Sequence, residues 1–255
     1  MDVNESSGSD QRGGAASQTV RALLGIRELI LGGELTPGSR ISELWVVDRL
    51  GMSRTPVRSA LIRLQEEGLL EPIPSGGFAV RSFSETEIGD AIELRGTVEG
   101  FAARLAAERG VSAGMLDALR ECVDQIDLAL EGDLTQEKFS AYVDMNAQFH
   151  RLLASAAQSR VAEQQIERVT NLPFASASAF VMVQSIEEGA REMLLIAQAQ
   201  HRAVVEAIEN REGARAEALM REHARIAHRN LRLALQNQKA LARLLGGNLI
   251  RRDSV

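Results

Sequence analysis

Histidine spacing is the feature of this 255-residue chain that points most directly to chemistry, and all four histidines lie in its C-terminal part: His150, His201, His223 and His228. Asn146 lies four residues before His150, so their side chains share one face of a helix. His201 and His223 flank the turn expected at residues 210–213, roughly ten residues before it and eleven after it. In an antiparallel helical hairpin these distances place both rings at the same level. Three imidazoles and one carboxamide can then converge in a bundle core, where helical proteins hold metals.

The ligand types indicate which metal such a site would take. Three neutral imidazoles and one oxygen suit Zn²⁺ or Ni²⁺ better than Ca²⁺ or Mg²⁺. His228 follows His223 by five residues, about 140° further around a helix at roughly 100° per residue, so we leave it out of the site. The sequence therefore predicts a divalent metal site with these ligands: Asn146, His150, His201 and His223.

A metal held by four protein ligands keeps positions open when it accepts five or six, and a carboxylate effector could fill them. Arg95 is a candidate second anchor for that carboxylate, because a guanidinium pairs with a carboxylate through two hydrogen bonds. The alternative for Arg95 is an ion pair with Glu93, Glu99 or another acid on a neighbouring helix.

A second group of residues with chemical potential is basic. The whole chain carries a net charge of −6, which by itself argues against nucleic acid as a partner. The segment Arg49–Gln65 reverses that inference locally, because it contains four arginines and no acidic residue. Arg54 and Arg58 are four residues apart and project from one helix face.

The elements around these arginines form a recognisable pattern over residues 18–84. Apolar spacing predicts a helix over Thr19–Leu31, a short helix over Ser42–Leu50 and, after a tight turn, a third helix that Ser53 caps. Two short strands around Ser75–Gly77 follow. Three helices and a hairpin are the pattern of a winged helix-turn-helix, in which the third helix enters the major groove. The candidate DNA-binding residues are Ser53, Arg54, Thr55, Arg58, Arg63, Gly76 and Gly77.

The remainder of the chain reads as an all-helical bundle. Helices are predicted over residues 85–109, 113–131, 135–157, 160–183, 187–209 and 213–245. The fold class is therefore mainly α, with two domains between two loose ends. The predicted divisions are a disordered tail (1–17), a DNA-binding domain (18–84), a helical effector-binding and dimerisation domain (85–245) and a frayed C-terminus (246–255).

Composition and targeting signals favour a cytoplasmic location. The N-terminus has no apolar stretch typical of a signal peptide, and no window approaches 18 apolar residues in a row. The single cysteine, Cys122, cannot form an internal disulfide, which suggests a reducing compartment. We therefore expect a cytoplasmic protein without a disulfide framework.

Two stretches resemble a known family. The sequence SRTPVRSALIRLQEEGLL (53–70), with the preceding ISELWVVDRLGM, resembles the GntR superfamily of bacterial transcription regulators. AIELRGTVEGFAARLAAERG (91–110) is similar to the opening helix of the FCD effector domain of the FadR-like subfamily. The resemblance covers about residues 18–235. It implies that Arg54, Thr55 and Arg58 contact operator bases and phosphates, and that the wing tip lies at Gly76–Gly77.

The resemblance also bears on the metal and the effector. Many FCD domains bind a divalent metal through an Asp or Asn, a His four residues later and two further His; NAQFHR (146–151), QHRAVVEAI (200–208) and MREHARIAH (220–228) match that order. Together with LPFASA (172–177), these motifs resemble the branch that includes vanillate-responsive repressors. This implies an aromatic carboxylic acid as effector, with sugar acids and other organic acids as alternatives. Candidates to line its pocket are Phe149, Phe174 and Phe180.

These features favour a ligand-responsive DNA-binding repressor of a catabolic operon, which binds a palindromic operator as a homodimer. A metal-dependent enzyme that uses the three histidines is one alternative. No motif places a carboxylate as general base, however, and an enzyme would leave residues 18–84 unexplained. A helical scaffold with a structural metal and no effector is the other alternative.

Overall fold

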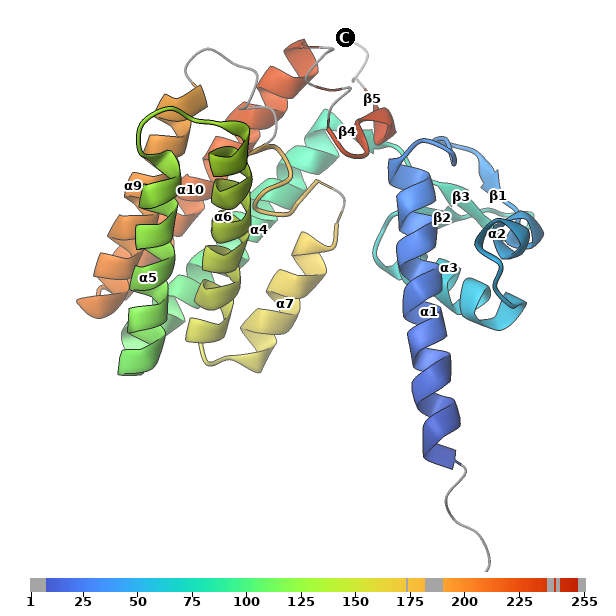
Figure 1. Ribbon diagram of the computed structural model, residues 1–255, viewed down its shortest axis with the longest axis horizontal. Coiled ribbons are helices and arrows are strands. Elements are labelled where there is room, and N and C mark those ends of the chain that lie inside the picture. The colour runs from blue at the N-terminus through green and yellow to red at the C-terminus, as the bar shows by residue number, and fades with distance from the viewer. Residues whose placement is uncertain (1–7, 173, 182–189, 238–240, 242–243, 252–255) are drawn as a thin grey trace, which may run out of the picture. The chain divides into compact units, whose positions relative to one another are not determined.

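The structure is a computed structural model, and it describes residues 8–172, 174–181, 190–237, 241 and 244–251 (Figure 1). Two compact units make up the chain. The N-terminal unit contains residues up to Phe83 together with Leu245–Arg251, and the helical unit begins at Ser84 and extends to Leu244. Most of the regular structure is helical, which confirms the prediction of a mainly α fold. Among the described helices, none is long and apolar enough to cross a membrane.

The N-terminal unit is built on three helices: α1 (Gly8–Leu31), α2 (Glu43–Leu50) and α3 (Arg54–Glu66). Helix α3 packs against α1. Its fully buried residues have the i, i+3, i+4, i+7 spacing of one helix face: Val57, Ala60, Leu61 and Leu64. Gly51 ends α2 with a φ of 62°, in the left-handed region that favours glycine. The predicted tight turn between α2 and α3 follows from this residue.

Two serines stand at the starts of these helices, and only one caps as expected. The Ser42 hydroxyl accepts a hydrogen bond from the backbone N–H of Trp45 at 3.3 Å, as an N-cap should. Ser53 occupies the N-cap position of α3, but its side chain makes no capping hydrogen bond. Its predicted position as the N-cap residue is therefore confirmed, but the capping hydrogen bond is not formed, and Ser53 is exposed at the start of the candidate recognition helix.

A small antiparallel sheet completes the winged helix-turn-helix. Its strands lie in the order β1 (Arg40–Ile41), β3 (Phe78–Val80), β2 (Leu70–Pro72). Glu71 of β2 and Arg40 of β1 both pair with Ala79 of the central strand. The hairpin of β2 and β3 was predicted from the glycine turn between them. Strand β1 was not, because the prolines and glycines around it predict only a turn.

The helical unit contains α4 (Glu85–Arg109), α5 (Ala113–Leu130), α6 (Gln136–Ala156), α7 (Arg160–Thr170), α9 (Ala190–Glu209) and α10 (Gly213–Gln236) (Figure 1). The helix predicted over residues 160–183 is wrong beyond Thr170, since residues 174–181 form mostly turns. Pro173 follows Leu172 in the sequence and disfavours a helical conformation at the residue before it. Helix α10 ends at Gln236 rather than at 245. Residues 182–189, which contain the predicted end of one helix and start of the next, lie outside the described residues.

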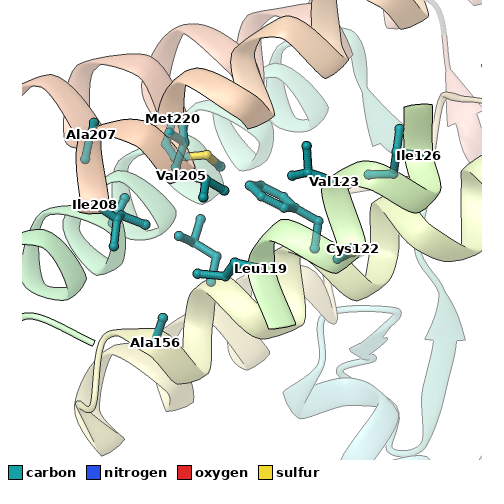
Figure 2. Close-up of a cluster of buried hydrophobic side chains, with 14 of the residues drawn as sticks. Leu119, Cys122, Val123, Ile126, Ala156, Val205, Ala207, Ile208 and Met220 are labelled. Atoms are coloured by element: carbon teal, nitrogen blue, oxygen red, sulfur yellow. The ribbon is translucent and has the colours of Figure 1, made fainter. Parts of the chain in front are cut away.

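The core of the helical unit lies between α5, α6, α9 and α10 (Figure 2). Leu119 and Ile126 of α5 are fully buried and meet Met220 of α10 and Phe149 of α6 in this cluster. Each such side chain contributes roughly 1.5–3 kcal/mol by leaving water. This cluster fixes the relative positions of the helices that carry the histidines.

Helices α4 and α10 pack closely because α4 presents glycines to its partner. Gly89, Gly96 and Gly100 lie seven and four residues apart, a spacing that keeps them on one helix face. A Cβ atom added at Gly96 would lie 2.5 Å from the Cβ of Ala224, and one at Gly100 would lie 2.9 Å from a backbone carbonyl oxygen of α10. Larger residues at these positions would push the helices apart.

This close packing gives a first testable expectation. Gly96→Ala should lower the free energy of unfolding by about 1–3 kcal/mol, because overpacking forces neighbouring atoms to shift. Gly114→Ala in α5 is the matched control, since nothing lies within 4 Å of its added Cβ. That change should be neutral or stabilise the helix by up to about 1 kcal/mol. Urea unfolding followed by far-ultraviolet circular dichroism measures both, and equal values would contradict the packing described.

Both predicted loose ends differ from the structure. Helix α1 begins at Gly8, inside the tail predicted over residues 1–17, because an existing helix extends at one hydrogen bond per added residue. The frayed C-terminus predicted over residues 246–255 is wrong for its first part. There, η1 (Gly247–Leu249) and β5 (Ile250–Arg251) belong to the N-terminal unit, where Leu249 is fully buried.

Candidate functional site

Three of the four histidines converge inside the helical unit. His150 of α6, His201 of α9 and His223 of α10 each offer a ring nitrogen, and these nitrogens lie within 4.8 Å of one another. The Nε2 atoms of His201 and His223 are 3.2 Å apart. Ligand nitrogens bound 2.0–2.1 Å from one ion lie about 3–3.4 Å apart, so this separation fits a shared metal. All three rings are buried.

Each of the three rings is oriented by an oxygen that faces its Nδ1 atom. The partners and distances are Glu99 Oε1 at 2.8 Å for His150, Gln198 Oε1 at 3.2 Å for His201 and Gln200 Oε1 at 3.1 Å for His223. Carboxylate and amide oxygens only accept hydrogen bonds, so every ring donates through Nδ1. The lone pairs of the three Nε2 atoms are then available to bind an ion between the rings. Two lone pairs 3.2 Å apart repel each other unless a cation, or a proton on one of the rings, lies between them.

A chain of hydrogen bonds that ends at an exposed arginine holds the His201 ring in its orientation. The Gln198 amide nitrogen donates to the Val123 carbonyl oxygen and to Asp127 Oδ1, both at 2.8 Å, which turns the amide oxygen toward His201. Arg202 in turn donates to Asp127. Such outer partners fix the tautomer of a ligating histidine and raise its basicity. Gln198 and Gln200 were not among the predicted site residues, although both precede His201 in the QAQH stretch.

Burial sets the charge of the centre. It lowers the pKa of His201, and it lowers the pKa of His223 to about 3, with the neighbouring rings adding to the effect. Burial alone would raise the pKa of Glu99, but His150 and Arg95 outweigh it and lower that pKa to about 2. His201 and His223 are therefore neutral at pH 7, the state that binds metals, and Glu99 places a negative charge beside them.

Arg95 forms a buried ion pair with Glu99. Its Nη1 donates to Glu99 Oε2 at 2.8 Å, and both side chains are at most 2% exposed. Of the two roles considered for Arg95, the ion pair is therefore present in the structure. Its Nε atom is nevertheless buried without a hydrogen-bond partner among the described residues. An unsatisfied buried donor costs about 1–3 kcal/mol, which a ligand oxygen would offset.

Asn146 lies beside a small cavity that Arg95 and His223 also line. The cavity has a volume of about 20 Å³, which is room for about one water molecule. The Asn146 amide nitrogen donates to Ser178 Oγ at 3.2 Å, so its oxygen stays free to act as a ligand. Phe180 lines this cavity and stacks on Phe174, with ring centroids 6.1 Å apart.

Two further residues have structural roles. Phe149, the third candidate pocket residue, stacks against His201 with ring centroids 4.2 Å apart and is fully buried. His228 donates from Nε2 to the carbonyl oxygen of Gly89 at 3.0 Å, so it packs α10 against α4. A larger cavity of about 490 Å³ lies on another side of the centre, between α4, α6 and α7, with Glu99 and His150 in its wall.

The candidate DNA-binding surface lies at the start of α3. Arg54, Thr55 and Arg58 are exposed, and neither arginine forms an ion pair with a described residue. Arg63 differs, because its Nε lies 3.5 Å from Glu67 Oε1 at the end of the same helix. The positive end of the helix dipole adds to the two free charges at the start of α3.

The wing supplies the rest of this surface. Gly76 and Gly77 have φ angles of 84° and 94°, which favour glycine, and no other atom lies within 4 Å of a Cβ added at Gly76. Arg40 of β1 donates to the Gly76 carbonyl oxygen at 2.9 Å. Arg40 was not among the predicted DNA-binding residues, although it adds a basic group at the wing tip. The pairing of β1 with β3, which brings it there, leaves no local pattern in the sequence.

Comparison with known proteins identifies both units. A family model of the FCD domain matches residues 90–225, and a model of the bacterial regulatory proteins of the gntR family matches residues 18–80. The chain is a GntR-family transcription regulator with an FCD domain. The regulator's DNA-binding family match falls within the N-terminal unit, and its FCD match falls within the helical unit.

Relatives and solved structures agree with this assignment. The regulator is 28% identical to the HTH-type transcriptional repressor RspR of Escherichia coli K12 over 189 residues, which cover 74% of this chain and 78% of RspR. It is 29% identical over 209 residues to the HTH-type transcriptional repressor GlaR of the same organism, with coverages of 80% and 93%. A structure titled E. coli McbR/YncC shares the fold with a TM-score of 0.59 and 20% identity, covering 86% of this chain and 97% of that one. The family and its named members are transcription regulators, not enzymes.

Glu99 offers a direct test of the histidine centre in this regulator. Glu99→Gln keeps an oxygen that can face His150 Nδ1 but removes the negative charge, so affinity for Zn²⁺ should fall by about 10–100-fold. Glu93→Gln on the same helix is the matched control, because Glu93 is exposed, and it should leave the affinity unchanged. Competition with a chelating zinc indicator measures both, after circular dichroism shows that each variant is folded. Equal affinities would exclude Glu99 from the centre.

Proposed function

We propose that this regulator is a repressor whose helical unit holds a divalent metal and binds a small organic carboxylic acid there. The observation that carries the proposal is the pair of Nε2 atoms 3.2 Å apart on His201 and His223, whose Nδ1 atoms both face acceptors. A metal ion bound between the rings would satisfy both lone pairs. Two relatives, RspR and GlaR, are named as transcriptional repressors, which supports repression as the direction of control.

The proposed ligands of the metal are the following: Asn146, His150, His201 and His223. They fit a borderline ion such as Zn²⁺ or Ni²⁺, because the nitrogen donors outnumber the single oxygen donor. His150 Nε2 supports the fit, since it is buried and has no hydrogen-bond partner among the described residues. A bound metal would supply a Lewis acid with open positions for a carboxylate.

The effector of the proposal is an acid, either aromatic or aliphatic, whose carboxylate meets both the metal and the unsatisfied Arg95 Nε. The cavity beside Asn146 holds about one water, so a larger acid must displace the side chains that line it. Phe180, His223 and Asn230 are among them, and the last two belong to α10. Binding would therefore shift α10, and such a differential effect on two states is what allosteric control requires.

On the DNA side, the proposed regulator binds as a homodimer to a palindromic operator, since one recognition helix reads one half-site. Arg54, Thr55 and Arg58 would contact bases and phosphates, with Gly76 and Gly77 at the wing tip. Arg63 would contribute less, because Glu67 neutralises part of its charge.

The proposal is tested with the DNA region upstream of the regulator's own gene. Purified full-length protein should shift this fragment in a gel, and unrelated DNA should compete poorly with the fragment for the protein. The affinity for the fragment should fall steeply as the salt concentration rises. Elemental analysis of the same preparation should find about one Zn²⁺ or Ni²⁺ per chain. A structural metal without an effector would leave DNA affinity and melting temperature unchanged across a panel of organic acids. Absence of a sequence-selective shift would contradict the regulatory function itself.

A further inference from the structure

The C-terminal segment, Leu245–Arg251, follows the last part of the helical unit in sequence but belongs to the N-terminal unit. Its 3₁₀-helix η1 contacts α1, and its strand β5 pairs with β4 (Phe83–Ser84). Both family matches end before it, at residues 80 and 225. The DNA-binding unit therefore contains a piece of chain that the family relationship does not account for.

This segment has a defined local structure. Gly246 has a φ of 79° and stands at the start of η1, and its carbonyl oxygen accepts a hydrogen bond from Leu249 N–H at 2.8 Å. Leu249 is fully buried, whereas Leu245 is 70% exposed. The segment is thus held in the N-terminal unit chiefly by one apolar side chain and by the strand pair.

The segment begins next to an anchor in the other unit. Leu244 belongs to the helical unit and is buried there, and Leu249 is buried in the N-terminal unit. Five residues of extended chain span at most about 18 Å. A displacement that separates the two anchors by more than this length must therefore move one of them.

The first connection between the units is shorter still. Phe83 is buried in the N-terminal unit, and the next residue, Ser84, caps α4 of the helical unit. Ser84 Oγ accepts from Glu87 N–H at 3.1 Å, and Glu87 Oε2 accepts from Ser84 N–H at 2.9 Å. Phe83 and Ser84 form β4, which pairs with β5 of the C-terminal segment.

We propose that the C-terminal segment is a tether through which helix α10 acts on the DNA-binding unit. Helix α10 carries His223, and the chain from its last residue, Gln236, reaches the buried Leu249 after thirteen residues. A shift of α10 is thereby transmitted to α1, which packs directly on the candidate recognition helix α3. That metal and acid binding shift α10 rests on the proposed function. The connection between α10 and the DNA-binding unit does not depend on it.

Hydrogen–deuterium exchange on the full-length protein tests the tether without metal or DNA. Leu249→Asp places a charge in an apolar site and should release the segment, whereas Leu245→Asp makes the same change at an exposed position of the same segment. Leu249→Asp should raise exchange by at least about 10-fold both in residues 19–31 of α1 and in residues 226–236 of α10. Leu245→Asp should alter neither. Faster exchange confined to α1, or in neither helix, overturns the proposal.

A second variant keeps the test decisive if Leu249→Asp fails to fold. Insertion of five Gly/Ser residues between Leu245 and Gly246 lengthens the connection and leaves Leu249 in place. Trp45, the single tryptophan of the chain, lies in the N-terminal unit, so its fluorescence reports the melting of that unit. The insertion should leave this transition within about 2 °C of the wild type. It should also abolish any change in DNA affinity that metal and acid cause in the wild type.

The outcomes of this second test separate the tether from the function. A full response to metal and acid in the insertion variant overturns the tether. If the wild type itself shows no response, the proposed function fails, and exchange in α10 of the insertion variant then decides the tether. In that case a lengthened tether should raise exchange in residues 226–236, and unchanged exchange would contradict it.

Discussion

His223→Ala is expected to lower the affinity of the regulator for Zn²⁺ or Ni²⁺ by at least about 100-fold, beyond the 10–100-fold typical of outer partners. The change removes one of the two Nε2 atoms that lie 3.2 Å apart, and with it a nitrogen that no other described histidine can replace. Isothermal titration calorimetry, or competition with a chelator of known affinity, measures the loss.

His228→Ala is the matched control for this experiment, because it makes the same change five residues further along α10. His228 donates to the Gly89 carbonyl oxygen and is absent from the cluster of three histidines. It should therefore retain the metal, with at most a loss of stability from the contact between α10 and α4. A loss of metal that is as large as in His223→Ala would show that the centre has been misplaced.

Arg54→Ala and Arg58→Ala are expected to have the largest effects on DNA. Both side chains are exposed on the first turns of α3 and have no ion pair within the described chain. A base contact from either arginine is worth about 1–3 kcal/mol, or roughly 5–150-fold in affinity. A phosphate contact would instead reduce the slope of log affinity against log salt by about one. Fluorescence anisotropy of the labelled upstream fragment at several salt concentrations separates the two.

Two arginines of the same unit serve as controls. Arg63 lies on α3 but pairs with Glu67, and Arg49 pairs with Glu34 at 3.1 Å. Replacing either by alanine should weaken DNA binding less than replacing Arg54 or Arg58. If all four variants lose the same affinity, the arginines act only as a diffuse positive charge, and α3 is not the element that reads sequence.

Local patterns were enough to predict much of the fold. The spacing of Val57, Ala60, Leu61 and Leu64 gives the buried face of α3, because helical period alone determines which side chains share a face. That His201 and His223 lie at the same height along a helical hairpin follows from counting residues on each side of one turn. Both inferences need only contacts that are close in sequence or that a single hairpin brings together.

Other features depend on packing between distant segments, which no local pattern records. Glu99 faces His150 across 51 residues of sequence, and its position in the chain predicts only a candidate ion pair with Arg95. Leu249 is one apolar residue in a glycine-rich stretch without periodicity, so nothing in the sequence predicts its burial in the N-terminal unit. Arg95 is a third case, because a guanidinium can bind either an effector carboxylate or the carboxylate of a neighbouring side chain. The sequence alone does not distinguish these two roles.

The claim that a metal-bound acid controls DNA affinity is tested most directly by one titration. Anisotropy of the upstream fragment is measured with metal-loaded wild type, metal-free wild type and His223→Ala, as vanillate and then gluconate are added. The account predicts that at least one acid changes the affinity of the metal-loaded wild type by about 5–150-fold, the usual range of allosteric coupling, and leaves the other two proteins unaffected. The same change in metal-free protein, or no change with any acid, would contradict it.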